Sequence, residues 1–346
     1  MQHRDTNRRG LPHPFGYIFR VEWKQRHILS GALENRPDAL CEYSRLQIHP
    51  LSLILCVPSQ LGTPEWGTYR HFAQVSQDTL VIPNLIENTL EVAKIVINSD
   101  DTPRLAPLCV LQLPPLSQNV SLYHLFCRAE PNITGSGPIA IPSPSNRPFR
   151  DKAEDAIIIF HMSYQQPLAL SWFTLIVQRR ALYAHIPAVH RACVPFCSAP
   201  EPVPELVHVP WSAWGPPATH WSLSNSTSMS WVTTTAGQRA VTLEDRMPSP
   251  IIVRDFNPYV VRAARALATA SGQSQEGNRS KPPNGNRTTL KVEGSVLTAG
   301  SIFEEDVWSF LPYVEIETQR EYHYEGVMID EERILGLKVR FEHSCR

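Results

Sequence analysis

The chain lacks the short motifs that mark common catalytic and nucleotide-binding sites. Its 346 residues contain no Gly-x-Ser-x-Gly elbow, no Gly-x-x-x-x-Gly-Lys-Ser/Thr phosphate loop and no Gly-x-Gly-x-x-Gly dinucleotide loop. The seven cysteines are odd in number and scattered, as free thiols would be, and none lies in a protease-like context. The sequence therefore predicts neither an enzyme nor a cofactor.

The chain also lacks an excess of basic over acidic residues, or of acidic over basic ones. The chain has 32 basic and 33 acidic residues, for a formal net charge of -1. Proteins that bind nucleic acids neutralise phosphates with a basic excess or stripe, and the dense basic run here is confined to the first ten residues. We expect no nucleic-acid partner.

Long apolar runs are absent as well. The longest, residues 51–57 and 156–160, are far shorter than the roughly 20 residues of a membrane span. No apolar run follows the positive charges of the first ten residues, so the sequence predicts no secretory signal. We expect no membrane contact and a cytoplasmic or nuclear location.

Proline and short apolar runs are what the chain has in quantity. Proline accounts for 31 residues, and runs rich in Val, Ile and aromatic residues recur between Pro, Gly, Asn and Asp, which is typical of strands. We count roughly 16 to 19 such runs. The clearest are residues 17–23, 51–57, 90–97, 108–113, 156–163, 172–177, 181–186 and 251–256.

These runs predict an all-β fold, built as a β-propeller-like array of short antiparallel strands that is either complete or short of blades. At about four strands a blade, they would make about four or five blades. One large sandwich or barrel is the alternative.

Two hairpins are expected. The first joins residues 229–235 to 238–243 through a turn in which Gly237 supplies a positive φ. The second joins residues 314–318 to 322–324 through a charged turn.

One stretch predicts a helix, near residues 258–270. Asn257 suits the N-cap, Pro258 suits the first helical position, and Gly272 follows the end. The residues after it are rich in Gly, Ser, Asn and Pro. The predicted organisation is a disordered basic tip (1–16), a β-rich propeller-like domain (17–270), a flexible insert (271–293) and a closing β segment of the same domain (294–346).

A set of metal-ligand types occurs at His185, His190, Cys193 and Cys197. Zinc takes such ligands tetrahedrally, but structural sites usually join two separated pairs of ligands. Pro187 and Pro195 interrupt this segment. The expected reading is a strand end followed by a loop, with no metal bound, and a zinc-dependent enzyme using this cluster is the least favoured alternative.

Aromatic residues are the candidate binding groups. Trp211, Trp214 and Trp221 lie within 11 residues, and Trp308 and Tyr313 follow the acidic run Glu304-Glu-Asp306. Large aromatic side chains either anchor the packing of sheets or form binding hot spots, and packing is favoured for the Trp211–Trp221 group. The acidic runs at 304–306 and 330–332 predict charged turns that close a β module.

The chain resembles a large family of F-box-type proteins from mushroom-forming fungi. The resemblance rests on residues 209–216, 237–239, 251–258, 300–307, 311–313 and 326–338, in preserved order over about residues 80 to 340. It implies a propeller-like domain that selects the protein substrate of an SCF ubiquitin ligase, preceded by a helical F-box that docks on a Skp-type adaptor.

The N-terminal segment departs from that plan. Residues 11–19 resemble the opening of an F-box, but Pro14 and Gly16 oppose a helix and residues 17–23 alternate as a strand. We therefore expect the F-box to be absent and adaptor binding to be doubtful. The expected function is a non-enzymatic protein-interaction domain with an unknown protein substrate; a structural or decayed paralogue without a specific partner is the alternative.

Overall fold

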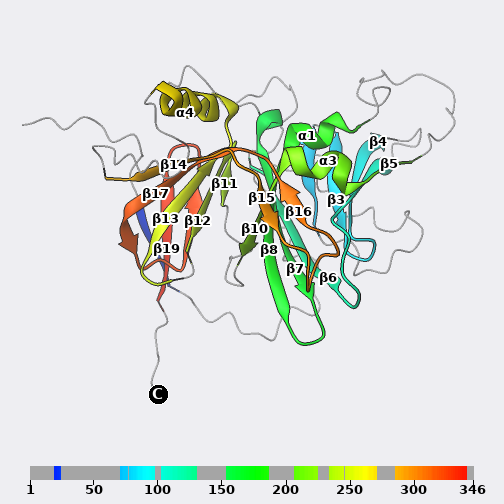
Figure 1. Ribbon diagram of the computed structural model, residues 1–346, viewed down its shortest axis with the longest axis horizontal. Coiled ribbons are helices and arrows are strands. Elements are labelled where there is room, and N and C mark those ends of the chain that lie inside the picture. Colours follow the sequence, from blue (N-terminus) through cyan, green and yellow to red (C-terminus); the bar gives the residue numbers. More distant parts are fainter. Residues whose placement is uncertain are drawn as a thin grey trace, which may run out of the picture.

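The computed structural model describes residues 19–24, 71–76, 78–97, 103–130, 153–186, 206–224, 234–244, 246–270 and 285–340. Over these residues the chain is mostly β, with nineteen strands, three α-helices and one 3-10 helix (Figure 1). Most strand pairs are antiparallel, which confirms the expected fold class at this level.

Sheets 1 and 2 are built from strands between residues 73 and 224. Sheet 1 has the order β2-β3-β4-β5-β9, with β9 parallel to β5. Sheet 2 has the order β10-β8-β7-β6 and is antiparallel throughout. The strands of sheet 1 are β2 (Ala73–Ser76), β3 (Thr79–Asn84), β4 (Thr89–Ile97), β5 (Pro103–Gln112) and β9 (Val207–Val209), and those of sheet 2 are β6 (Ser121–Arg128), β7 (Ile157–Gln165), β8 (Leu170–Gln178) and β10 (Thr219–Ser224).

Sheets 3 and 4 combine distant parts of the chain. Sheet 3 has the order β11-β12-β13-β17-β14, so β17 lies between two strands that precede it in sequence. In sheet 4, β19 pairs with β18 and, in parallel, with β1, the first strand among the described residues. The strands are β11 (Thr235–Ala236), β12 (Arg239–Leu243), β13 (Ser249–Asp255), β14 (Arg287–Lys291) and β17 (Tyr313–Tyr322) in sheet 3, and β1 (Phe19–Lys24), β18 (Gly326–Ile329) and β19 (Ile334–Arg340) in sheet 4.

A two-stranded sheet formed by β15 (Ser295–Leu297) and β16 (Val307–Ser309) completes the set. Sheets 3, 2 and 1 lie side by side from left to right in Figure 1. Three hydrophobic cores join successive layers: one between sheets 1 and 2, one between sheets 2 and 3, and one between sheets 3 and 4.

Sheet 2 is buried on both faces, and its sequence explains why. Along β7, Ile158 and Phe160 belong to the core shared with sheet 1, whereas Ile157 and Ile159 belong to the core shared with sheet 3. Side chains alternate between the two faces of a strand, so a strand packed on both sides needs a continuous apolar run. Residues 156–160 are such a run.

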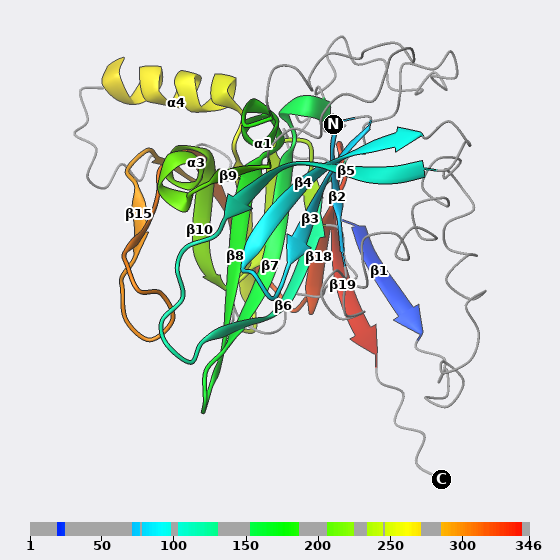
Figure 2. The same ribbon diagram turned by 90° about the vertical axis from the view of Figure 1, so that its right-hand side faces the viewer.

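The helix expected near 258–270 is confirmed as α4 (Pro258–Ala270), and the Asn257 side chain accepts a hydrogen bond from the Tyr259 N–H, as an N-cap does. Two further helices are α1 (Arg179–Ala184) and α3 (Trp211–Ala218), and the short 3-10 helix is η3 (Ala153–Asp155). The strand expected over 181–186 is therefore wrong, because helix α1 occupies most of it. All three α-helices lie at the same end of the sheets (Figures 1 and 2).

One expected hairpin is confirmed within the described residues, and the other is wrong. Strands β11 and β12 are joined by a turn at Gly237, whose φ is 59°. By contrast, residues 319–321 do not turn, because β17 pairs with β13 from Val314 to Tyr322 across a bulge near Ile251. The Thr318 hydroxyl accepts the Ile251 N–H (2.9 Å) at this bulge, so the backbone donor is satisfied.

The last acidic run closes a hairpin as expected. Asp330 Oδ1 accepts the N–H groups of Glu332 and Arg333 in the turn between β18 and β19. Strand β14 lies inside the stretch expected to be a flexible insert, so regular structure resumes earlier than the predicted boundary at 293. Among the helices that the structure describes, none has the length and apolar character needed to cross a membrane.

Candidate functional site

Three of the candidate aromatic residues form a buried group, the tryptophan cluster (Trp211, Trp214 and Trp221). Trp214 is completely buried and packs edge-on against Trp211, with ring centroids 5.1 Å apart. Its indole N–H donates to the Gln112 carbonyl (2.8 Å), which ties α3 to the end of β5. The cluster therefore anchors packing, as the sequence favoured, and offers no surface to a partner.

Tyr313 is also buried, in the core between sheets 2 and 3. Its ring lies against His220 (centroids 4.7 Å apart) and Phe256 (5.2 Å apart). Burial, with a smaller contribution from the positive charge of Arg254, lowers the pKa of His220 to about 3, so this imidazole is neutral at physiological pH. Tyr313 is a structural residue.

Trp308 differs from the other candidates because it is exposed. Its ring stacks on Phe310, with centroids 6.0 Å apart and planes 7° apart. Trp308 is 44% exposed, Phe310 is 48% exposed, and Val296, the cross-strand neighbour of Trp308, is 38% exposed. These three side chains form an apolar surface, the aromatic patch.

The outward direction of the patch follows from what lies beneath it. On β16 the neighbours of Trp308 are Val307 and Ser309, and both are buried. The Ser309 hydroxyl accepts the Trp221 N–H (3.2 Å) and lies 2.9 Å from the Ser295 hydroxyl, so this strand face is committed to the interior. Because side chains alternate along a strand, Trp308 and Phe310 must face outward.

The hairpin that carries the patch is held firmly by the core. Phe303, in the loop between β15 and β16, is buried and packs edge-on against Tyr164, Phe173 and Trp221. The Phe310 N–H donates to the Pro216 carbonyl in the last turn of α3 (2.8 Å). The rings of the patch are thus displayed on a preorganised support.

Acidic residues occupy the loop end of the same hairpin. Asp306 serves the loop itself, since its side chain accepts the Ala299 N–H (2.7 Å). Glu304 and Glu305 are exposed, and within the described residues neither side chain has an ion pair. The site thus combines an apolar centre with a negatively charged edge.

Phe310 is the functional candidate that sequence reasoning missed. The signal was present as alternation in Val307-Trp-Ser-Phe310, where a small polar residue separates two large aromatic ones. Reading it requires knowing that Val307 and Ser309 face the interior, which the pattern alone leaves open.

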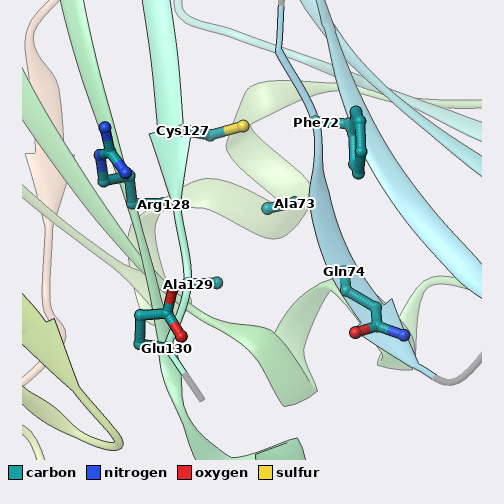
Figure 3. Close-up of a pocket in the computed structure, with 7 residues that line it drawn as sticks. All are labelled: Phe72, Ala73, Gln74, Cys127, Arg128, Ala129 and Glu130. Carbon is teal, nitrogen blue, oxygen red and sulfur yellow. The ribbon is translucent and has the colours of Figure 1, made fainter. Parts of the chain in front are cut away.

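A small pocket of about 130 Å³ lies between β2 and β6, the edge strands of sheets 1 and 2 (Figure 3). Its lining residues are Phe72, Ala73, Gln74, Cys127, Arg128, Ala129 and Glu130. Burial raises the pKa of the Cys127 thiol to about 12, so the thiol stays protonated and is a poor nucleophile at neutral pH. The pocket has room for a few water molecules, and burial also raises the pKa of the Glu130 carboxyl in its lining.

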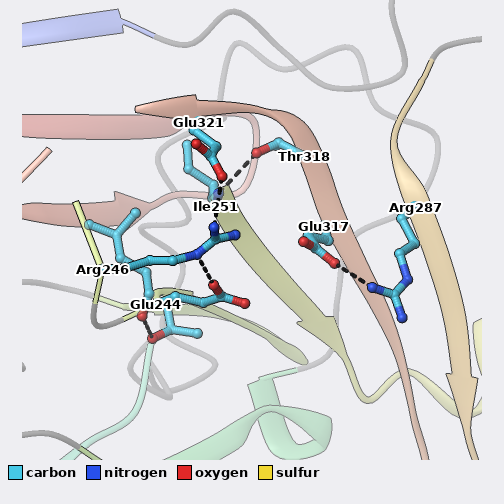
Figure 4. Close-up of polar contacts among 9 residues, drawn as sticks. Glu244, Arg246, Ile251, Arg287, Glu317, Thr318 and Glu321 are labelled. Atoms are coloured by element: carbon cyan, nitrogen blue, oxygen red, sulfur yellow. Dashed lines mark hydrogen bonds and ion pairs between the residues drawn. The ribbon is translucent and has the colours of Figure 1, made fainter. Parts of the chain in front are cut away.

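Several charged residues on and beside the strands of sheet 3 form ion pairs (Figure 4). Arg246 forms ion pairs with Glu244 (2.6 Å) and Glu321 (3.0 Å), and Arg287 forms one with Glu317 (3.3 Å). The Arg287–Glu317 pair joins the neighbouring strands β14 and β17, where the two residues face each other in the register.

The expected metal-like cluster falls mostly outside the described residues. His185 follows α1 and donates its backbone N–H to the Leu182 carbonyl (3.2 Å), whereas His190, Cys193 and Cys197 lie outside the described ranges. Within those ranges, no group of three or more His, Cys, Asp or Glu residues is arranged to hold a metal ion.

Comparisons with known proteins found no match to the chain. No protein-family model matches the chain, and no curated protein or solved structure is detectably similar to it. The function has to be inferred from the site itself.

Proposed function

We propose that the chain is a protein-interaction domain that binds a partner through the aromatic patch and performs no reaction. One observation carries the proposal: Trp308 on β16 and Phe310, which directly follows β16, stack in parallel and are each close to half exposed, while Ser309 between them is buried. Tryptophan and other large aromatic residues dominate the energy of protein interfaces. A patch on a rigid support also loses little conformational entropy when a partner binds.

The charge beside the patch defines the partner's chemistry. Glu304 and Glu305 lie at one end of the hairpin without ion pairs among the described residues. A complementary surface would place an apolar group over the rings and arginine or lysine toward the loop.

The resemblance to fungal F-box-type proteins supports a role in substrate recognition. Residues 300–307 carry part of that resemblance, and they form the loop and the first residue of β16 that hold the patch in place. We propose that the partner is a protein substrate, as for the recognition domain of an SCF ubiquitin ligase. In this proposal the adaptor is not bound by the chain itself.

We extend the proposal to a propeller-like arrangement. Sheets 1 to 4 pack face to face in succession, as neighbouring blades do, and the first strands of sheets 1, 2 and 3 (β2, β6 and β11) are edge strands. Such edges would surround a central axis. An experimental structure with the sheets closed in a ring would support this arrangement, and an open stack would contradict it.

Site-specific photo-crosslinking tests the interaction. A photoreactive phenylalanine analogue at position 310, in cells that express the chain, is expected to capture one discrete protein partner. Trp308→Ala should abolish the capture while circular dichroism and melting stay unchanged. The matched control places the analogue at Tyr123, another exposed aromatic residue, on edge strand β6.

Equal capture at positions 310 and 123, or none at 310, would contradict the proposal. The ligase role has its own test, which is ubiquitination of the captured partner. Loss of Trp308 should reduce that modification, and direct binding of purified Skp-type adaptor would overturn our prediction that the F-box is absent.

A further inference from the structure

Helix α4 exposes an apolar face that no other described element covers. Of its thirteen residues only Val261 is buried, against the sheet 3 side of the molecule. Tyr259 and Leu267 are each 72% exposed, and Val260 is exposed as well. Soluble helices normally turn such residues inward, so this face requires an explanation.

The helical period separates the two apolar faces of α4. Val261, Ala264 and Ala268 follow the three-to-four-residue spacing of one face and are the least exposed positions. Tyr259, Ala263, Ala266 and Leu267 lie on the face roughly opposite, and the structure describes all of them as exposed. Sheet 3 thus lies against one side of α4, as Figure 1 shows, and the residues on the other side are exposed.

A basic edge borders the open face. Arg262 and Arg265 are exposed and the helix contains no acidic residue. The Arg262 guanidinium lies over the Tyr259 ring, 4.6 Å from its centroid, which places positive charge beside the apolar surface. A fitting partner therefore has exposed apolar groups and negative charge.

The same chain presents a surface of that kind. The aromatic patch is apolar, and Glu304 and Glu305 at the end of its hairpin lack ion pairs among the described residues. The strands that α4 contacts most are β14 and β17, which do not belong to the hairpin that carries the patch. Figure 2 shows α4 and β15 extending to the same side of the molecule.

We propose that α4 of one copy docks on the aromatic patch of a second copy, with Arg262 and Arg265 facing Glu304 and Glu305. The proposal rests on the proposed function, because it takes the patch to be a protein-binding surface. Since α4 and β15 extend to the same side of the molecule, two copies can make the contact reciprocally, in a symmetric dimer. A net charge of -1 opposes this association little. Self-association then covers the patch and competes with a foreign partner.

Charge reversal tests the pairing directly. Arg262→Glu with Arg265→Glu, and separately Glu304→Arg with Glu305→Arg, place like charges across both contacts of a dimer. Each double variant is expected to weaken self-association about tenfold or more in sedimentation velocity. Mixing the two variants restores opposite charges at both contacts, so a heterodimer should form with about wild-type affinity. Arg320→Glu is the matched control. Arg320 is exposed near the C-terminal end of β17, on neither α4 nor the β15–β16 hairpin, so this charge reversal should leave the dimer unchanged.

A wild-type chain that remains monomeric up to roughly 100 µM overturns the proposal, as does a mixture that fails to associate. Leu267→Gln is the second probe, because it removes apolar contact without touching charge and should also give a monomer. The two proposals fail separately: α4 variants should lose the dimer and still crosslink a foreign partner through position 310. Loss of that crosslink in the α4 variants would show that the partner captured there was another copy of the chain.

Discussion

The tryptophan cluster and the aromatic patch use the same kind of side chain on adjoining segments, but in opposite environments. They are joined by two backbone donors: the Phe310 N–H bonds to Pro216 (2.8 Å), and the Trp221 N–H bonds to Ser309 (3.2 Å). Trp214 is completely buried, whereas Trp308 is 44% exposed. The comparison therefore separates the contribution of aromatic residues to folding from their contribution to binding.

The difference arises from what covers each strand or helix face. Helix α3 lies over the open end of the core between sheets 1 and 2, so its tryptophans are covered on every side. Strand β16 covers that core with Val307 and Ser309 and has no further layer outside it among the described residues. Aromatic residues on its other face remain available to another molecule.

Truncation of the tryptophans should produce the largest contrast. Trp214→Ala removes a fully buried ring and the donor to Gln112, so we expect a loss of about 3–5 kcal/mol in the free energy of unfolding. Trp308→Ala should cost less than about 1 kcal/mol, because its ring is already partly hydrated. Urea titration followed by circular dichroism measures both.

Trp214→Phe keeps the comparison measurable if Trp214→Ala does not fold. It retains a ring and loses the hydrogen bond to the Gln112 carbonyl, so an intermediate cost of about 1–3 kcal/mol is expected. Equal costs for Trp214→Ala and Trp308→Ala would remove the distinction between the two regions.

Acid should lower the free energy of unfolding through His220, the buried residue of β10 that precedes Trp221. The pKa of His220 is lowered from 6.5 to about 3 in the folded chain by burial and by Arg254, so below pH 6.5 only the unfolded state takes up the proton. The stabilising contribution of neutral His220 is therefore complete above pH 6.5 and is lost as pH falls toward 3. At pH 5 the loss is about 2 kcal/mol.

The pH slope isolates this residue. His220→Gln cannot titrate, so its unfolding free energy should fall with acid by about 1.4 kcal/mol less per pH unit than that of the wild type between pH 6 and 4. Burial also lowers the pKa of His161 to about 4, which leaves a remaining acid-dependent loss in the variant. Identical slopes for the variant and the wild type would show that His220 is accessible to protons in the folded chain.

Two glycines give the comparison with the smallest expected effects. Gly215 lies against a ring of the tryptophan cluster, and Gly294 lies against a ring of the aromatic patch. A Cβ at Gly215 would come within 2.2 Å of the Trp211 ring, and one at Gly294 within 2.3 Å of the Phe310 ring. Trp211 is enclosed, so Gly215→Ala should cost about 1–3 kcal/mol. Phe310 can move toward solvent, so Gly294→Ala should cost less than about 0.5 kcal/mol and instead disrupt the stack with Trp308.

Thermal melting reports the stability difference, and capture through a photoreactive group at position 308 reports the patch. Gly294→Ala should reduce capture at nearly unchanged stability, whereas Gly215→Ala should lower stability with less effect on capture in the folded fraction. If Gly294→Ala instead lowered stability and left capture unchanged, the Phe310 ring would contribute to the core rather than to a binding surface.

The sequence was sufficient for several of the described strands and for one helix. Runs such as 156–163 and 251–256 are apolar and β-branched enough to form β7 and β13, and Asn257 with Pro258 marks the start of α4. These signals are local, because they depend on alternation, capping and backbone preference within a few residues.

Errors arose where distant partners override local preference. The polar run at 319–321 resembles a turn, but β13 pairs with β17 on both sides of a bulge, at residues 314–317 and 321–322, and keeps the strand extended. Residues 181–186 alternate weakly as a strand, yet α1 covers most of them. Its first residue, Arg179, is buried and donates to the carbonyl of Ala153, which is distant in sequence. Such pairings join residues that no local window contains.

For the aromatic candidates, too, some properties follow from the local sequence and others from contacts between distant parts of the chain. Their number, their spacing and the alternation around Trp308 are properties of the sequence, and they predicted a β-rich chain with aromatic anchors. Which of the anchors would face solvent depended on how many layers cover each strand, and that is a consequence of packing between sheets. Alternation gives every strand two faces, but only the neighbouring layer determines which face is buried, so Trp214 stabilises the fold while Trp308 remains on the surface.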